Sequence, residues 1–238
     1  MNQPTITPSD ELPPAMPLRV FLAILFAAAF GALAAILVLP RWLPGLGISL
    51  QGTAPQAFWF LSRSSALVAY LLMWLSMSLG LMITNKLARL WPGGPLAFDL
   101  HQFTSLLGVA FALFHALILL GDQYIHTTLW HTVVPFAMQE YHPFWVGLGQ
   151  LGFYLMACVA FSFYVRKQIT PRVWRLIHYL SFAGFLLALI HGITSGSDSQ
   201  IFLAKSIYWL TGGSFIFLFI YRLLGRLVKP AARQTSSL

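Results

Sequence analysis

The chain has 238 residues, of which 58% are hydrophobic and 8% are charged, and its mean hydropathy is +0.75. A soluble domain carries about 25% charged residues, so this composition excludes a water-soluble enzyme and a disordered chain. The single cysteine, Cys158, excludes an internal disulfide, a Cys-x-x-Cys metal site and a thiolate iron–sulfur cluster. The length suits a bundle of about six membrane-spanning helices.

Six apolar segments follow one another along the chain. Residues 1–18 are polar and rich in proline, which predicts a flexible tail. Val20–Leu39 then runs without a charge and is longer than the apolar region of a signal peptide, so we favour an uncleaved span. The other spans are expected at about Phe58–Ile83, Asp99–Asp122, Phe144–Val165, Val173–Thr194 and Ile207–Leu224. The sequence therefore predicts an all-α, six-helix transmembrane domain over residues 19–225 and a cytoplasmic tail over 226–238.

The positive charges divide unequally between the two sides of this bundle. Of the 14 Lys and Arg residues, the side with both termini holds Arg19, Lys86, Arg89, Arg166, Lys167, Arg172, Arg175, Arg222, Arg226, Lys229 and Arg233. The opposite side holds Arg41 and Lys205, with Arg63 inside the nearest span. The positive-inside rule then places both termini in the cytoplasm. The Lys and Arg side chains that give the net charge of +8 are expected to anchor the helices at lipid headgroups. Nucleic acid is therefore not an expected partner.

Four histidines lie within two of the expected spans. His101 and His115 are 14 residues apart in the third span, and His178 and His191 are 13 apart in the fifth. Each spacing corresponds to roughly 20 Å along a helix. Both spans run outward from the cytoplasm, so His101 and His178 share an inner level, and His115 and His191 share an outer level. One buried histidine is most simply bonded to a main-chain carbonyl, but two pairs suit bis-axial ligation of two haem irons.

The spacing of 13 residues leaves one geometric difficulty. On an ideal helix, 14 residues return a side chain to within about 40°, whereas 13 residues leave it about 140° away. We therefore expect the fifth span to be tilted, locally overwound, or bent near Gly184, where Ser181 lies close in sequence. Otherwise His191 faces elsewhere and a single haem is bound.

These histidines and their neighbours resemble the ferric reductase-like transmembrane domain, which NADPH oxidases and metalloreductases share. The similarity covers about residues 57–225. It lies in the two histidine spacings, Leu61-Ser62-Arg63-Ser64, Asp99-Leu100-His101-Gln102-Phe103, Trp174-Arg175-Leu176-Ile177-His178 and the segment from His191 to Asp198. The resemblance implies a six-helix bundle with two stacked b haems. It also implies electrons that enter from a cytoplasmic flavin and leave outside to oxygen or a metal ion.

The resemblance stops short of the long members of that family. Only fourteen residues follow Leu224, and no Gly-x-Gly-x-x-Gly fingerprint follows a strand. FAD or FMN is therefore expected only on a separate cytoplasmic flavoprotein, with a quinol as the alternative donor. The resemblance also suggests a bacterial inner or plasma membrane. The chain is expected to be the electron-transfer component of an oxidoreductase.

Two other functions remain open. The second hypothesis is a haem-binding membrane subunit that passes electrons to a dedicated outer protein, as in the periplasmic methionine sulfoxide reductase system. The third is a non-redox six-span transporter that uses the histidines for protons or metal. A transporter would more often show broken spans in both halves, and the sequence has no such pair.

Two arginines complete the expected site. By resemblance, Arg63 pairs with a propionate of the outer haem or attracts an anionic substrate, and the alternative is a snorkelling anchor. Arg175 precedes His178 by three residues and thus lies on nearly the same helix face. It holds an inner propionate or meets the electron donor, or else it is simply one of several basic residues in a cytoplasmic loop.

Other residues have simpler interpretations. The phenylalanines between the two levels are expected to pack rather than to bridge haems: Phe111, Phe114, Phe182 and Phe185. The polar residues of the outer loop match no fixed ligand spacing, so we expect solvated polarity rather than a metal site: Asp122, His126, His131, Glu140 and His142. Cys158 is expected to act as a small apolar residue.

Overall fold

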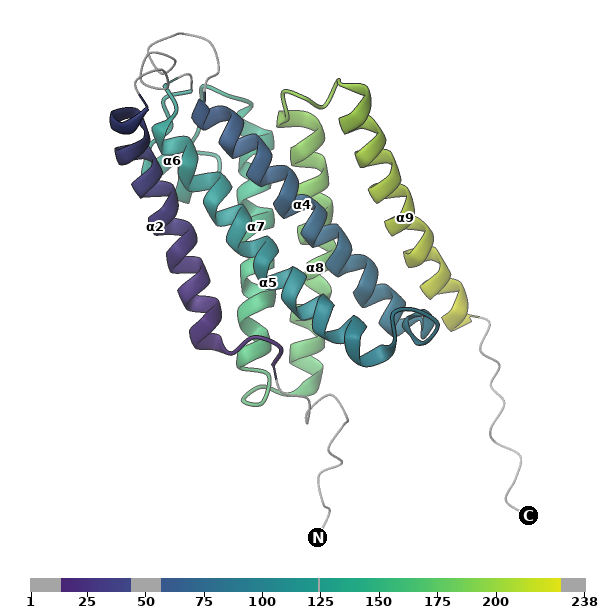
Figure 1. Ribbon diagram of the computed structural model, residues 1–238. Helices are drawn as coiled ribbons and strands as arrows, with labels where there is room; N and C mark the ends of the chain where they lie inside the picture. The colour runs from purple at the N-terminus through teal and green to yellow at the C-terminus, as the bar shows by residue number, and fades with distance from the viewer. Residues whose placement is uncertain (1–13, 44–56, 124, 228–238) are drawn as a thin grey trace, which may run out of the picture.

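The computed structural model describes residues 14–43, 57–123 and 125–227 (Figure 1). Within these ranges the helices are α2 (Leu18–Trp42), α4 (Ala57–Thr84), α5 (Gly94–Ile118), α6 (Leu129–Val133), α7 (Pro143–Tyr164), α8 (Pro171–Ser195) and α9 (Phe202–Leu227). Two 3₁₀ turns, η1 (Leu87–Arg89) and η2 (Leu119–Gly121), complete the secondary structure of these residues, which includes no strand. All the helices except the short α6 are long and apolar enough to cross a membrane. The predicted all-α, six-helix membrane bundle is confirmed.

Two helices begin earlier than the sequence predicts. Helix α5 begins at Gly94 rather than Asp99, and α9 begins at Phe202 rather than Ile207. The expected limits lay at or just inside a charged residue, Asp99 for α5 and Lys205 for α9. A helix satisfies its own main-chain hydrogen bonds, so it continues past the apolar stretch into the headgroup region. The proline at position 95 is compatible with the first turn of α5, where no main-chain N–H partner is needed.

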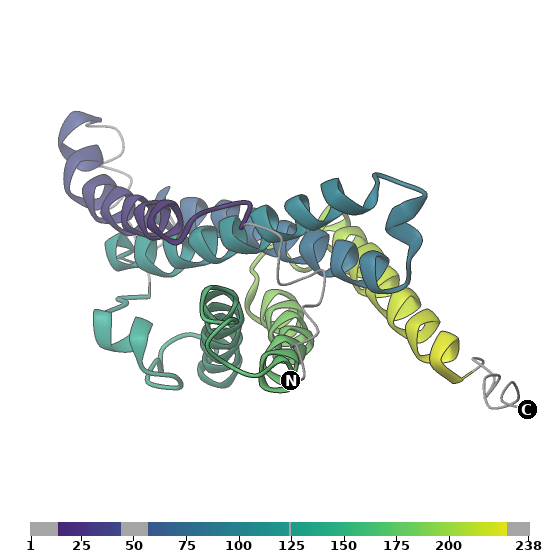
Figure 2. The same ribbon diagram turned by 90° about the horizontal axis from the view of Figure 1, so that it is seen from below.

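The helices form two layers (Figure 2). Helices α2, α5 and α4 lie side by side in one layer, α7 and α8 form the other, and α9 flanks α4. The closest packing is between α4 and α5, where small residues let the backbones approach. A Cβ added at Gly108 of α5 would lie 3.3 Å from Met73 Cγ of α4. In Figure 1, α4 and α5 slant relative to the upright α7 and α8, so the two layers cross at an angle.

Helix α9 is joined to α4 by polar contacts. The indole N–H of Trp74 donates to Ser214 Oγ at 2.9 Å, and the hydroxyl groups of Tyr70 and Thr211 bond to each other. Trp209, elsewhere on α9, is 81% exposed, as expected for a side chain that faces lipid. Interhelical hydrogen bonds therefore supply part of the attachment of a helix that buries little of its own surface.

Helix α2 begins and α9 ends at the same side of the bundle (Figure 1). The chain approaching α2 departs from the expected tail at residues 15 and 16. Met16 is only 5% exposed, its carbonyl accepts from Tyr164 Oη at 3.1 Å, and the Ala15 N–H donates to Gln102 Oε1 at 3.2 Å. The apolar side chain of Met16 thus belongs to the core. Residues 1–13 and 228–238 lie outside the described residues, so the rest of both tails remains a prediction.

Candidate functional site

The four intramembrane histidines meet in two pairs between α5 and α8. The ring centroids of His101 and His178 are 6.0 Å apart with an interplanar angle of 71°. Those of His115 and His191 are 6.3 Å apart with an angle of 64°. The pairing by level that the spacing predicts is therefore present. The role of these residues as haem ligands stays a prediction at this point.

Helix α4 orients both histidines of α5. His101 Nδ1 lies 2.8 Å from the main-chain oxygen of Ser76, and His115 Nδ1 lies 2.9 Å from that of Ser62. A carbonyl oxygen only accepts, so Nδ1 carries the proton in both rings. The Ser62 hydroxyl donates in turn to the His115 carbonyl at 3.1 Å. Each ring is thereby fixed in the tautomer that keeps the Nε2 lone pair available.

Helix α7 orients His191 in the same way. Its Nδ1 lies 3.0 Å from the main-chain oxygen of Trp145. A Cβ added at Gly149, one turn further along α7, would lie 2.6 Å from both Cγ and Nδ1 of His191. The ring therefore packs directly on the backbone of α7 at a position where glycine is required.

His178 differs from the other three histidines. Among the described residues it forms no hydrogen bond, and its ring instead stacks on Trp174 of the same helix, with centroids 5.2 Å apart and an interplanar angle of 26°. Trp174 Nε1 is buried and has no hydrogen-bond partner within the described part of the chain. Within the pair of His101 and His178, only His101 is thus hydrogen-bonded to a main-chain oxygen of the described residues.

The crossing of the layers answers the difficulty of the 13-residue spacing. Helix α8 is continuous from Pro171 to Ser195, and of the three expected explanations, tilting, local overwinding or a bend near Gly184, the arrangement of the layers favours tilting. Gly184 is instead a packing position, because a Cβ there would lie 2.8 Å from Met156 Sδ of α7. Since α5 crosses α8 at an angle, the side of α8 that faces α5 changes along its length (Figure 1). Histidines that point in different directions on α8 therefore both meet α5.

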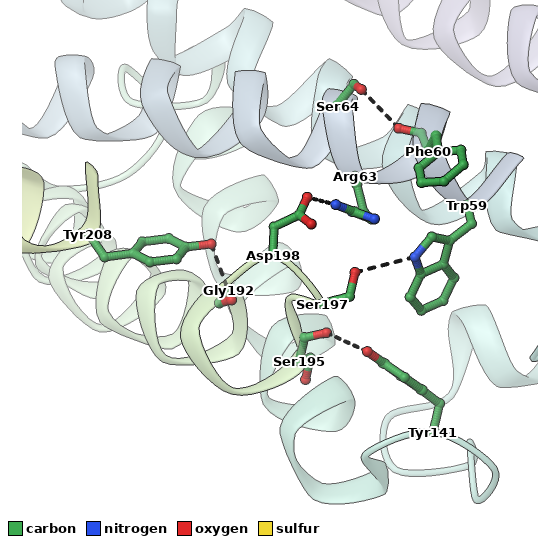
Figure 3. Close-up of polar contacts among 10 residues, drawn as sticks. All are labelled: Trp59, Phe60, Arg63, Ser64, Tyr141, Gly192, Ser195, Ser197, Asp198 and Tyr208. Carbon is green, nitrogen blue, oxygen red and sulfur yellow. Dashed lines mark hydrogen bonds and ion pairs between the residues drawn. The ribbon is translucent and has the colours of Figure 1, made fainter. Parts of the chain in front are cut away.

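Arg63 forms an ion pair with Asp198 in the connection between α8 and α9 (Figure 3). Two hydrogen bonds tie neighbouring residues together in the same region. Trp59 Nε1 donates to Ser197 Oγ at 3.4 Å, and Tyr141 Oη donates to the Ser195 carbonyl at 2.8 Å. Asp198 is a partner that the sequence analysis did not identify. The propionate or substrate role of Arg63 remains a prediction.

Arg175 is not brought to the histidines by any contact. It is exposed in the first turns of α8, and no hydrogen bond or ion pair involves it within the described ranges. Its expected roles, as a partner of a haem propionate, as a contact for the electron donor or as one basic residue of a cytoplasmic loop, all stay predictions.

We expect Asp198→Asn and Arg63→Gln to lower the free energy of unfolding equally, by at most about 1 kcal/mol, because the pair is partly exposed. The double variant should lose no more than either single variant. SDS titration in mixed micelles measures these values. Unequal losses in the two single variants would contradict a role of Arg63 confined to this ion pair.

The outer-loop residues do not assemble into a metal site in the described part of the chain, which has no cluster of three or more His, Cys, Asp or Glu side chains. Glu140 bonds locally: hydrogen bonds from its own main-chain N–H and from that of Gln139 lower the pKa of its carboxyl. Phe185 is fully buried against Tyr70 and Phe215, with centroids 5.9 and 5.0 Å away, as expected for a packing residue. Cys158 is exposed on α7.

Comparison with known proteins gives one match. A family model described as a domain of unknown function matches residues 57–198. No curated protein and no solved structure matches the chain. The matched segment begins with α4 and ends at Asp198, so it contains all four histidines, Arg63 and its ion-pair partner, and it omits α2 and α9. Because the match covers more than half of its length, this chain belongs to the DUF8596 family, a domain of unknown function.

Proposed function

We propose that this chain is a transmembrane b-type cytochrome that binds two haem b groups, the inner between His101 and His178 and the outer between His115 and His191. Electrons pass from a cytoplasmic flavoprotein or quinol, through the two haems, to an acceptor outside such as a metal ion or oxygen. The protein lies in a bacterial inner or plasma membrane with both termini inside. The sequence resemblance to the ferric reductase-like domain supports this proposal.

The observation that carries the proposal is the separation of the paired rings. A metal–imidazole bond is about 2.0 Å long, and a ring nitrogen lies about 1.1 Å from its centroid, so imidazoles on opposite sides of one metal ion have centroids roughly 6 Å apart. The two observed separations are 6.0 and 6.3 Å. A tetrahedral metal site takes three or four protein ligands. Haem brings four nitrogens of its own and requires only two axial ligands, which is what each level offers.

The hydrogen bonds at Nδ1 are a second support. Metal-binding histidines usually donate their other ring N–H to a carbonyl or carboxylate, which fixes the ring and raises the basicity of the ligating nitrogen. His101, His115 and His191 all donate to main-chain oxygens. Each then presents Nε2 as the ligating atom.

Bound haem would supply one-electron redox chemistry, and the residues of this chain would hold it. Two histidines at each level would hold the haem iron, and this ligand set would favour electron transfer over oxygen binding at the metal. The apolar helices keep water from the site. The basic residues at the cytoplasmic ends of the helices, Arg175 among them, offer a docking surface for an acidic electron donor.

The first test is the absorption spectrum of the purified protein, reduced with dithionite and compared with the oxidised form. Pyridine haemochrome analysis should give two b haems per chain, and absence of haem after expression with adequate haem supply would refute the proposal. Proteoliposomes with trapped ferricyanide test the relay. External dithionite should bleach the ferricyanide only when the protein is present, and a two-haem protein that fails to do so is not a transmembrane relay.

A further inference from the structure

We propose that His178 is the exchangeable axial ligand of this cytochrome, so that the inner haem binds small external ligands such as carbon monoxide, and that Trp174 is the positioning residue that limits this exchange. The inference rests on the proposed function. It goes further in giving the two haem sites different ligand chemistry.

The difference begins with hydrogen bonding. Three of the four rings donate to a main-chain oxygen at 2.8–3.0 Å, and each of these acceptors belongs to a neighbouring helix. A hydrogen bond is directional and loses strength steeply when the ring turns. His178 forms no such bond to any described residue, so no acceptor on another helix fixes its rotation.

Stacking on Trp174 is the restraint that His178 has instead. Trp174 lies four residues before His178, one turn earlier on α8, so the two side chains move with the same helix. A stacked pair resists separation but tolerates sliding, because aromatic contacts accept offset arrangements. Trp174 Nε1 lacks a hydrogen-bond partner among the described residues, so stacking is the contact that these residues offer its indole.

The consequence is a difference between the two levels. At the outer level, both rings are bound to main-chain oxygens, and His191 also packs on Gly149. At the inner level, His178 is able to turn aside. Exchange with carbon monoxide breaks the bond from iron to Nε2 of His178 and forms a bond from iron to carbon, and no electron or proton is transferred.

The experiment is a carbon monoxide titration of the dithionite-reduced, two-haem protein. The absorption bands of one of the two haems, the inner one, should shift on binding carbon monoxide, and those of the outer haem should not. Changing a residue that supports a metal ligand typically weakens metal binding by about 10- to 100-fold. Trp174→Leu should therefore strengthen carbon monoxide binding by about tenfold. Trp174→Phe, which retains a stacking ring, should stay near the unaltered protein. Leu187→Ala is the matched control, since Leu187 precedes the outer His191 by four residues, and it should have no effect.

Haem counting separates the possible failures. A protein without haem refutes the proposed function itself. Two haems that both resist carbon monoxide, or that both bind it equally, overturn the present inference only. An equal effect of Trp174→Leu and Leu187→Ala also overturns it. If Trp174→Leu fails to retain the inner haem, loss of one haem with the outer haem intact supports the positioning role, and loss of both contradicts it.

Discussion

In the proposed cytochrome, alanine in place of His101 is expected to leave one haem per chain instead of two. His101 is the only α5 histidine that faces His178, and the outer histidines lie about 20 Å further along the helices. A b haem is held by its axial bonds and by packing, so loss of one ligand removes the inner haem and leaves the outer one. His178→Ala should have the same effect, and His115→Ala or His191→Ala should remove the outer haem instead.

Pyridine haemochrome counts and reduced-minus-oxidised spectra measure this result. The pairing is tested by double variants: His101→Ala with His178→Ala should still leave one haem, whereas His101→Ala with His115→Ala should leave none. His126→Asn is the control, because His126 is an exposed loop histidine with a φ of 47°, which asparagine tolerates. Two haems retained in His101→Ala would show that the levels are assigned wrongly.

The second large effect is expected from a single added side chain on α7, which carries no haem ligand. In Gly149→Val, the new Cβ would lie 2.6 Å from Cγ and Nδ1 of His191, closer than real Cβ contacts allow. The His191 ring must then leave the Trp145 carbonyl and turn away from His115. We expect loss of the outer haem, with the inner haem and its spectrum retained.

Gly213→Val is the matched control for this prediction. Gly213 also lies in a membrane-spanning helix, α9, and a Cβ there meets nothing within 4 Å. The control should keep both haems. The retained inner haem reports that the Gly149→Val protein is folded. Two haems in Gly149→Val would mean that His191 does not bind the outer haem from the position seen here.

The helices follow from properties that can be read along one segment at a time. In a bilayer, a main chain without water must form its own hydrogen bonds, so a long apolar run becomes a helix whatever its neighbours are. Only the ends were misplaced, as at Gly94 and Phe202, where a charge was taken as the limit. The short helix α6 lies in a connection with no long apolar run and was not predicted.

The candidate site was predictable to a lesser extent. The residues that orient the histidines were missed, yet one signal existed for two of them. Ser62 and Ser76 are 14 residues apart on α4, the same separation as His101 and His115 on the antiparallel α5. Matching periods on adjacent antiparallel helices bring each serine opposite one histidine. The hydroxyl groups of both serines also lie within 3.0 Å of the histidine Nδ1 atoms, whereas Trp145 contributes only a main-chain oxygen, which no sequence signal indicated.

The sequence by itself determined that the chain forms six apolar helices and that two of them each carry a pair of histidines about 20 Å apart, because hydropathy and helical rise are local properties. Only the tertiary structure decided that α5 crosses α8, which brings His191 to His115 despite the 13-residue spacing. It also decided that Asp198 pairs with Arg63 and that Gly149 supports His191. These contacts depend on the angles at which helices pack, and the packing angle is set by side chains from several helices together.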